Sequence, residues 1–150
     1  MKNEGMTLIV RNTAKLIIGF IAVFGVYVAA TGHVGPGGGF AGGVILAAAA
    51  ILVVLAFGRT ASRRLVTEAQ CHTWDAAGAM AFLAVAVLGY LVGGFFVRFI
   101  PVGRTGDVAS GGTIPLSNLA IMVKVGAGLA GAFLALAAFR AGRTARREDG

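Results

Sequence analysis

Four long apolar stretches most constrain what this chain can fold into. Three of them, residues 16–32, 40–58 and 76–97, contain no Asp, Glu, Lys or Arg, and the fourth, 114–139, contains only Lys124. A helix that crosses a bilayer needs about 20 mostly apolar residues. Charged residues make up only 13% of the chain, whereas about a quarter is usual for a soluble domain. The sequence therefore predicts a protein that is embedded in a lipid bilayer.

The predicted fold is an all-α integral membrane protein with four transmembrane helices. The expected spans are about 16–32, 40–58, 76–97 and 116–139, in a single membrane domain over residues 1–150. Trp74, beside Asp75, suits an interfacial anchor at the start of the third span. A cleaved signal peptide is the competing interpretation of the first stretch, since a basic start precedes an apolar core. It is disfavoured, because the next span would then follow a glycine-rich mature N-terminus with no spacer.

The basic residues predict the orientation. Ten Lys and Arg lie before the first span, between the second and third, or after the fourth, and only two lie in the other two connections. Cytoplasmic loops carry such an excess, so we expect both termini in the cytoplasm and a multi-pass protein of the cytoplasmic membrane. The net charge of +7 is explained by this pattern, and no nucleic-acid partner is expected, because the basic residues do not follow one face with interleaved aromatics.

The connection between the first two spans, residues 32–43, is dominated by glycine. Such a composition suits a tight turn, followed by a helix whose backbone packs very close to a neighbour. Small residues continue at four-residue spacing as Gly39, Gly43 and Ala47, and recur in the third stretch as Gly89-x-x-x-Gly93. We expect these positions to pack helices together. Several smooth faces on only four helices also predict protein partners beyond this chain, besides the lipid bilayer.

Lys124 is the most informative polar residue. It would lie about 12 Å into the fourth helix at 1.5 Å per residue, where a charge costs about 2.5–3.5 kcal/mol. One interpretation is a lysine that snorkels outward or pairs with a carboxylate of a partner subunit. The other is an element of a proton or ion relay. The four predicted spans offer no Asp or Glu to pair with it.

Two further residues are candidates for the same path. Asn118 precedes Lys124 on the fourth helix and would extend its polar track. His33 lies at the mouth of the glycine-rich connection, and histidine titrates near neutral pH. It would either hand on protons or bond a loop carbonyl.

Self-contained catalysis is not expected. Gly37-Gly38-Gly39 lacks the Lys-Ser/Thr pair of a phosphate-binding loop, and the single Cys71 forms no Cys-x-x-Cys pair. The chain shows no Ser/His/Asp set, no metal-ligand spacing and no carboxylate pair. We therefore predict a protein that is not an enzyme, with no catalytic residues, no bound metal and no cofactor.

Two blocks of sequence resemble a known family. The first is Phe24-Gly25-x-Tyr27 followed by Gly32-His33-x-x-Pro36-Gly37-Gly38-Gly39-Phe40-x-Gly42-Gly43. The second is Gly112-Thr113-Ile114-Pro115-Leu116-Ser117-Asn118-Leu119 with Lys124-Val125-Gly126-Ala127-Gly128-Leu129. Together they resemble the MnhB/MrpB subunit of the Mrp/Mnh-type multisubunit Na⁺/H⁺ antiporters. The resemblance makes Pro36, Gly37, Gly38, Gly39, Phe40, Gly42 and Gly43 signature positions, but it gives no residue a settled mechanistic role.

The resemblance implies an accessory membrane subunit of a cation/proton antiporter. Its partners would be two large subunits similar to the proton-pumping subunits of respiratory complex I, and several small membrane subunits. Two alternatives remain open. One is a homologous subunit of an energy-converting complex such as a membrane-bound hydrogenase. The other is an unrelated four-helix exporter working as a homo-oligomer, which is disfavoured because such exporters need an intramembrane carboxylate.

Overall fold

Four long helices make up most of the protein. The computed structural model describes residues 6–58, 62, 66–97, 99–101, 103–104 and 108–148. The long helices are α1 (Leu8–Ala30), α2 (Gly39–Phe57), α4 (Glu68–Leu88) and α5 (Ile114–Glu148); two short 3₁₀ turns are η1 (Gly89–Leu91) and η2 (Val108–Gly111). Each long helix contains a segment long and apolar enough to cross a membrane. The predicted all-α fold with four membrane-length helices is confirmed.

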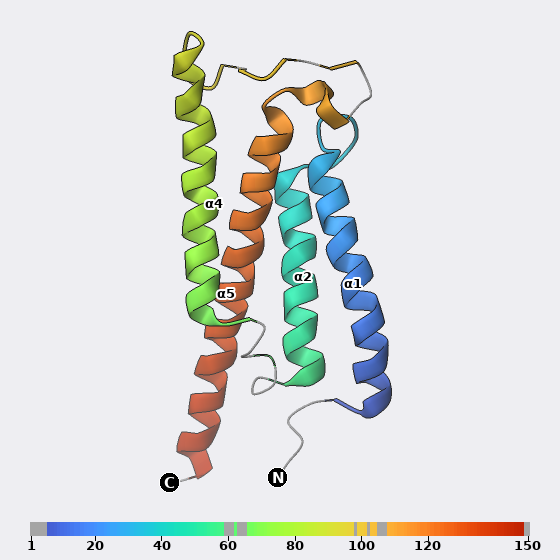
Figure 1. The fold of residues 1–150 in the computed structure, drawn as a ribbon. Helices are drawn as coiled ribbons and strands as arrows, with labels where there is room; N and C mark the ends of the chain where they lie inside the picture. Colours follow the sequence, from blue (N-terminus) through green and yellow to red (C-terminus); the bar gives the residue numbers. More distant parts are fainter. Residues whose placement is uncertain are drawn as a thin grey trace.

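The helices lie side by side in the order α1, α2, α5, α4, as Figure 1 shows. The main packing contacts join α1 to α2, α2 to α5, and α5 to α4. The chain therefore does not pack in sequence order, because its last helix lies between α2 and α4. The start of α1 and the end of α5 lie at the same end of this layer, and the α1–α2 connection lies at the other.

Glycines on α2 allow both of its neighbours to approach closely. A Cβ at Gly42 would lie 2.6 Å from the carbonyl oxygen of Gly25 on α1. On another face of α2, a Cβ at Gly43 would lie 2.7 Å from the Cβ of Val125 on α5, and one at Gly39 would collide with the Asn118 carbonyl oxygen. Helices in lipid associate through such small residues because lipid provides no hydrophobic drive for association.

The glycine-rich connection turns the chain from α1 into α2. The amide of Thr31 donates to the Tyr27 carbonyl at 2.9 Å as α1 ends. Gly37 and Gly38 have φ of 152° and 131°, a conformation that favours glycine. The amide of Gly38 then donates back to the Val28 carbonyl at 3.2 Å, so the connection folds over the end of α1.

Two helices, α1 and α4, begin eight residues earlier than expected. α1 begins at Leu8, before the predicted start at residue 16, because Leu8-Ile9-Val10 extend the apolar character and basic side chains at a helix end snorkel. α4 begins at Glu68, where Thr67 and Gln70 form a capping box and the Thr67 amide donates to Gln70 Oε1 at 3.1 Å. This start lies eight residues before the predicted one and brings Asp75 inside the helix.

The end of α4 requires a correction. The predicted span runs to residue 97, with Gly89 and Gly93 on a helix-packing face, but α4 ends at Leu88. Gly93 has φ of 147°, and the amides of Val92, Gly93 and Gly94 all donate to the Gly89 carbonyl. A Cβ at Gly89 would lie 2.6 Å from the Val97 amide nitrogen. These glycines therefore close a turn at the end of α4 and do not pack two helices together.

Candidate functional site

An ion pair between α4 and α5 is the main polar feature of the described helices. Lys124 Nζ donates to Asp75 Oδ1 at 2.9 Å. Lys124 is ten residues into α5, about 15 Å along its axis, and Asp75 is seven residues into α4, about 10 Å along that helix. Both helices contain membrane-length apolar segments that include these residues. The pair thus lies well inside both candidate spans.

Small residues on both helices make room for this pair. A Cβ at Gly78 would lie 2.7 Å from the Lys124 amide nitrogen, and one at Gly128 would lie 3.4 Å from Asp75 Oδ1. One turn further along, a Cβ at Gly131 would lie 3.1 Å from the Cβ of Cys71. Gly78 and Gly128 therefore bring the two backbones close enough for Asp75 to reach Lys124.

The expectation that Lys124 has no carboxylate within the spans was wrong. It depended on a third span that begins at residue 76, just after Asp75. The capping pattern Thr67-x-x-Gln70 indicates a helix start at Glu68, and it was the signal available in the sequence. With α4 extended toward its N-terminus, Asp75 comes to face Lys124. An exporter is therefore no longer disfavoured by the lack of an intramembrane carboxylate.

The pair lies on the outer surface of this chain. The side chains of Lys124 and Asp75 are 47% and 38% exposed. Ionisable residues within membrane spans almost always face a bundle interior, a water-filled cavity or one another. Here they face one another, but about half of the surface of the Lys124 side chain is not covered by this chain.

A hollow of about 250 Å³ adjoins the pair. It is lined by α4 and α5 alone, with Cys71, His72 and Asp75 on the α4 side. The α5 side consists only of alanine and glycine: Ala127, Gly128, Gly131, Ala132 and Ala135. The α5 wall of the hollow is therefore formed by small residues, whereas the α4 wall includes a carboxylate and an imidazole.

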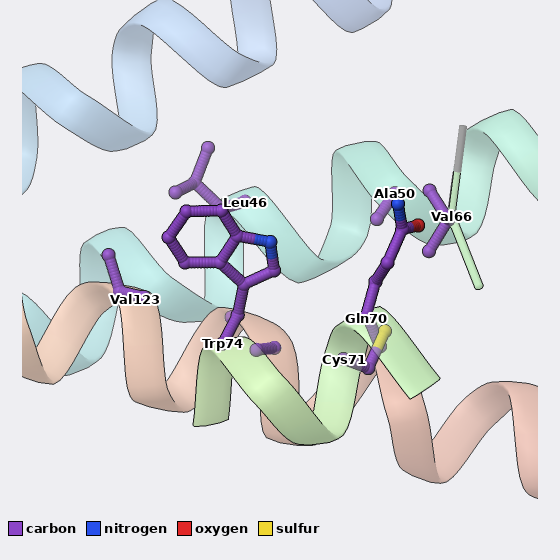
Figure 2. Close-up of a pocket in the computed structure, with 10 residues that line it drawn as sticks. Leu46, Ala50, Val66, Gln70, Cys71, Trp74 and Val123 are labelled. Atoms are coloured by element: carbon purple, nitrogen blue, oxygen red, sulfur yellow. The ribbon is translucent and has the colours of Figure 1, made fainter. Parts of the chain in front are cut away.

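A second hollow, of about 300 Å³, lies between α2, α4 and α5. Figure 2 shows the Trp74 indole lying near Leu46 of α2, while Gln70 extends toward Ala50. The remaining lining side chains are mostly aliphatic. Trp74 was expected to anchor the start of the third span, but it lies within α4 and partly covers this apolar groove.

The predicted path residues do not lie together. Asn118 is six residues before Lys124 and points about 120° away around the helix. Its side chain lies in the glycine-rich connection, where a Cβ at Gly32 would be 3.1 Å from Asn118 Nδ2 and one at Gly38 would be 3.8 Å from Oδ1. Asn118 therefore faces the α1–α2 connection, whereas Lys124 faces α4.

His33 lies near Asn118 and not near Lys124. Its ring packs on the segment that precedes α5, where a Cβ at Gly111 would lie 2.8 Å from His33 Cδ2. Pro36 and Phe40 are exposed on either side of the turn. His33 and Asn118 thus join the glycine-rich connection to the start of α5, which is a separate place from the ion pair.

The described residues offer no obvious metal site. Within the part of the chain that the structure describes, no group of three or more His, Cys, Asp or Glu side chains is placed to hold a metal ion. Cys71 is a free, buried thiol between α4 and α5. The charged side chains that the structure brings together within the described candidate spans are those of Lys124 and Asp75.

Comparison with known proteins agrees with this architecture. Residues 9–131 match the family described as "Domain related to MnhB subunit of Na+/H+ antiporter". An uncharacterized protein of Methanocaldococcus jannaschii is 35% identical over 75% of this chain and 43% of its own length. A putative antiporter subunit mnhB2 of Staphylococcus aureus is 47% identical over 33% of this chain and 35% of its own length.

One solved structure is also similar. A chain in the structure of the membrane-bound sulfane sulfur reductase, an archaeal respiratory membrane complex, superposes with a TM-score of 0.72 at 32% identity. The match covers 87% of this chain and 57% of that one. The matched part of this chain thus covers less than two thirds of the length of each of these three proteins. The family match contains both Asp75 and Lys124 and covers more than half of the sequence, and on that ground the chain belongs to the MnhB family of domains related to a subunit of the Na⁺/H⁺ antiporter.

Proposed function

We propose that this chain is an accessory membrane subunit of a multisubunit Na⁺/H⁺ antiporter. It resides in the cytoplasmic membrane with both termini in the cytoplasm, it supports assembly, and it lines part of an ion or proton path. It cleaves no bond. The observation that carries the proposal is the family match over residues 9–131, which contains the first three membrane-length helices almost entire and the ion-paired part of α5.

The exposed ion pair supports a role within a larger assembly. Lys124 and Asp75 are both more than a third exposed in this chain alone, and charges at such a depth are costly in contact with lipid. Other subunits remove that cost if they cover the pair. The proposed partners are two large proton-pump-like subunits and several small membrane subunits.

The proposal is tested in the organism's own membranes. The gene for this chain is deleted, and a pH gradient is imposed across everted membrane vesicles. We expect the Na⁺-dependent collapse of the gradient to disappear in the deletion strain and to return with the wild-type gene. Undiminished Na⁺-dependent collapse without this chain would contradict the proposal.

A second candidate function is a subunit of an energy-converting redox complex. The similarity to a chain of the archaeal sulfane sulfur reductase, at 32% identity over 87% of this chain, favours it. In such a complex, electron transfer would drive ion movement. Purification of the intact complex through a tag on this chain separates the two functions, because iron–sulfur absorbance and reduction of sulfane sulfur are expected only for the redox complex.

A further inference from the structure

We propose that the outer face of α4 and α5 around Asp75 and Lys124 is the docking surface for a transmembrane helix of another subunit. That helix presents a carboxylate or carboxamide oxygen to Lys124 and fills the hollow beside Asp75. The inference rests on the proposed function, because it requires a multisubunit complex. It goes further by naming the surface and the chemistry of the partner.

The first support is the depth and exposure of the pair. Lys124 is about 15 Å from the start of α5 and about 22 Å from Phe139, where the apolar segment ends. Its side chain is 47% exposed and that of Asp75 38%. A lysine near a helix end reaches water by snorkelling, but this one lies near the middle of its span. Another protein helix removes the contact with lipid.

The second support is the unfilled bonding capacity of the ammonium. A lysine ammonium has three N–H donors, and the bond to Asp75 Oδ1 uses one of them. The remaining donors require acceptors, and in the middle of a bilayer acceptors come from protein oxygens or enclosed water. The partner is therefore expected to offer an oxygen at the level of Lys124, and a lipid headgroup does not reach this depth.

The third support is the shape of the adjoining hollow. Its α5 wall contains only alanine and glycine, and its volume is about 250 Å³. Ala132 and Ala135 are exposed on this wall, so no described side chain covers it. Small residues allow a partner helix to approach closely, and the hollow accepts a large side chain from that helix. The ion pair and the small-residue wall of the hollow therefore lie on the same face of α4 and α5.

The shape requirement is tested by filling the hollow. Ala132→Phe places a ring in it, and Ala48→Phe makes the same change at an exposed alanine on α2. With a tagged chain in its native membrane, we expect Ala132→Phe to reduce co-purification of the other subunits by about tenfold. Ala48→Phe should leave co-purification unchanged. Wild-type co-purification with Ala132→Phe would overturn the docking surface.

A cysteine probe covers the case in which Ala132→Phe itself fails to accumulate. Ala132→Cys is placed in a Cys71→Ser background, and intact membranes are labelled with a maleimide that carries a benzophenone, which on irradiation inserts into a neighbouring C–H bond and so needs no cysteine in the partner. A product that joins this chain to a different subunit is expected. A product of two copies of this chain, or full labelling by a bulky maleimide without any cross-link, would overturn the proposal.

The chemistry of the contact is tested by exchanging the two charges. The double variant Asp75→Lys with Lys124→Asp keeps a pair within the chain but moves the ammonium to α4. We expect near wild-type amounts of the chain but about tenfold lower co-purification. Full co-purification would show that the pair acts within this chain only. Antiport is measured in the same vesicles to separate the two proposals. Intact antiport without any effect of these variants on co-purification overturns the docking surface alone. Absence of Na⁺-dependent antiport in wild-type membranes overturns the proposed function.

Discussion

At the scale of single residues, the pair formed by Asp75 and Lys124 joins α4 to α5 within the two candidate spans. Each residue makes the other tolerable within the membrane, since an unpaired charge at mid-span costs about 2.5–3.5 kcal/mol on insertion scales. Gly78 and Gly128 have no side chain, and a Cβ at either position would press on Lys124 or Asp75. The pair therefore depends on where the small residues lie on α4 and α5 as well as on the two charged residues themselves.

We expect removal of one charge to be worse than removal of both. Asp75→Asn removes the charged partner of Lys124 within this chain, and Lys124→Gln removes that of Asp75, so each single variant should lower stability by about 1–3 kcal/mol. The double variant should lose less than either single variant. The melting temperature of the purified complex measures this.

Glu68→Gln is the control for this experiment, because Glu68 is an exposed charge in the first turn of α4. It should leave the melting temperature unchanged. Strictly additive losses in the Asp75 and Lys124 variants would show that the two charges are not coupled.

At the scale of helices, the sequence predicted their number and type but not the limits that place the site. Long stretches with at most one charge are sufficient to identify four spans, because each span must be apolar over most of its length. The start of α4 depends instead on a polar capping box at Thr67 and Gln70, and a search for uncharged runs excludes it by construction. Such a search places Asp75 in a loop and so misses its pairing with Lys124.

Contacts between residues far apart in the sequence were the other feature that the sequence did not predict. The stripe of Gly39, Gly43 and Ala47 predicts a packing face, and α5 lies against it. Which helix would pack there was not predictable, because period and composition do not specify the neighbour. For the same reason the sequence alone groups Asn118 with Lys124, although the two residues face different helices.

The capping box should contribute measurably to α4. Thr67→Ala removes its hydroxyl partner and is expected to cost about 1 kcal/mol. Thr73→Ala is the matched control, since Thr73 Oγ1 only donates to the Ala69 carbonyl within the helix, at 3.0 Å. Thermal melting of the purified complex compares them. Equal melting temperatures for the two variants would mean that α4 does not depend on this cap.

The contact between α2 and α5 makes a second prediction about helices. Gly39→Leu would drive a side chain into the Asn118 carbonyl of α5, whereas a Cβ at Gly35 meets nothing within 4 Å. We expect Gly39→Leu to lose assembly first and antiport only as a consequence, and Gly35→Leu to keep both. Co-purification and vesicle antiport are measured together. Normal assembly with selective loss of antiport would contradict this order.

At the scale of the whole molecule, the layer α1–α2–α5–α4 leaves α4 at one edge (Figure 1). The charged pair joins α4 to its neighbour α5. Another subunit that covers the pair would remove its exposed part from contact with lipid. The layer also separates two polar regions, the ion pair and the connection that holds His33 and Asn118. An ion path through this chain alone would have to join them, whereas an assembly can use each in a different contact.

The orientation of the layer is the last prediction. The start of α1 and the end of α5 lie at the same end of the layer, and the excess of Lys and Arg in the sequence there predicts that this end faces the cytoplasm. A fusion of green fluorescent protein after Gly150 should therefore fluoresce, and a fusion of alkaline phosphatase at that position should be inactive. Alkaline phosphatase fused after Gly35, in the α1–α2 connection, should be active. The reverse pattern would place the glycine-rich connection in the cytoplasm, and with it His33 and Asn118, so that a proton path entering there would begin on the opposite side of the membrane.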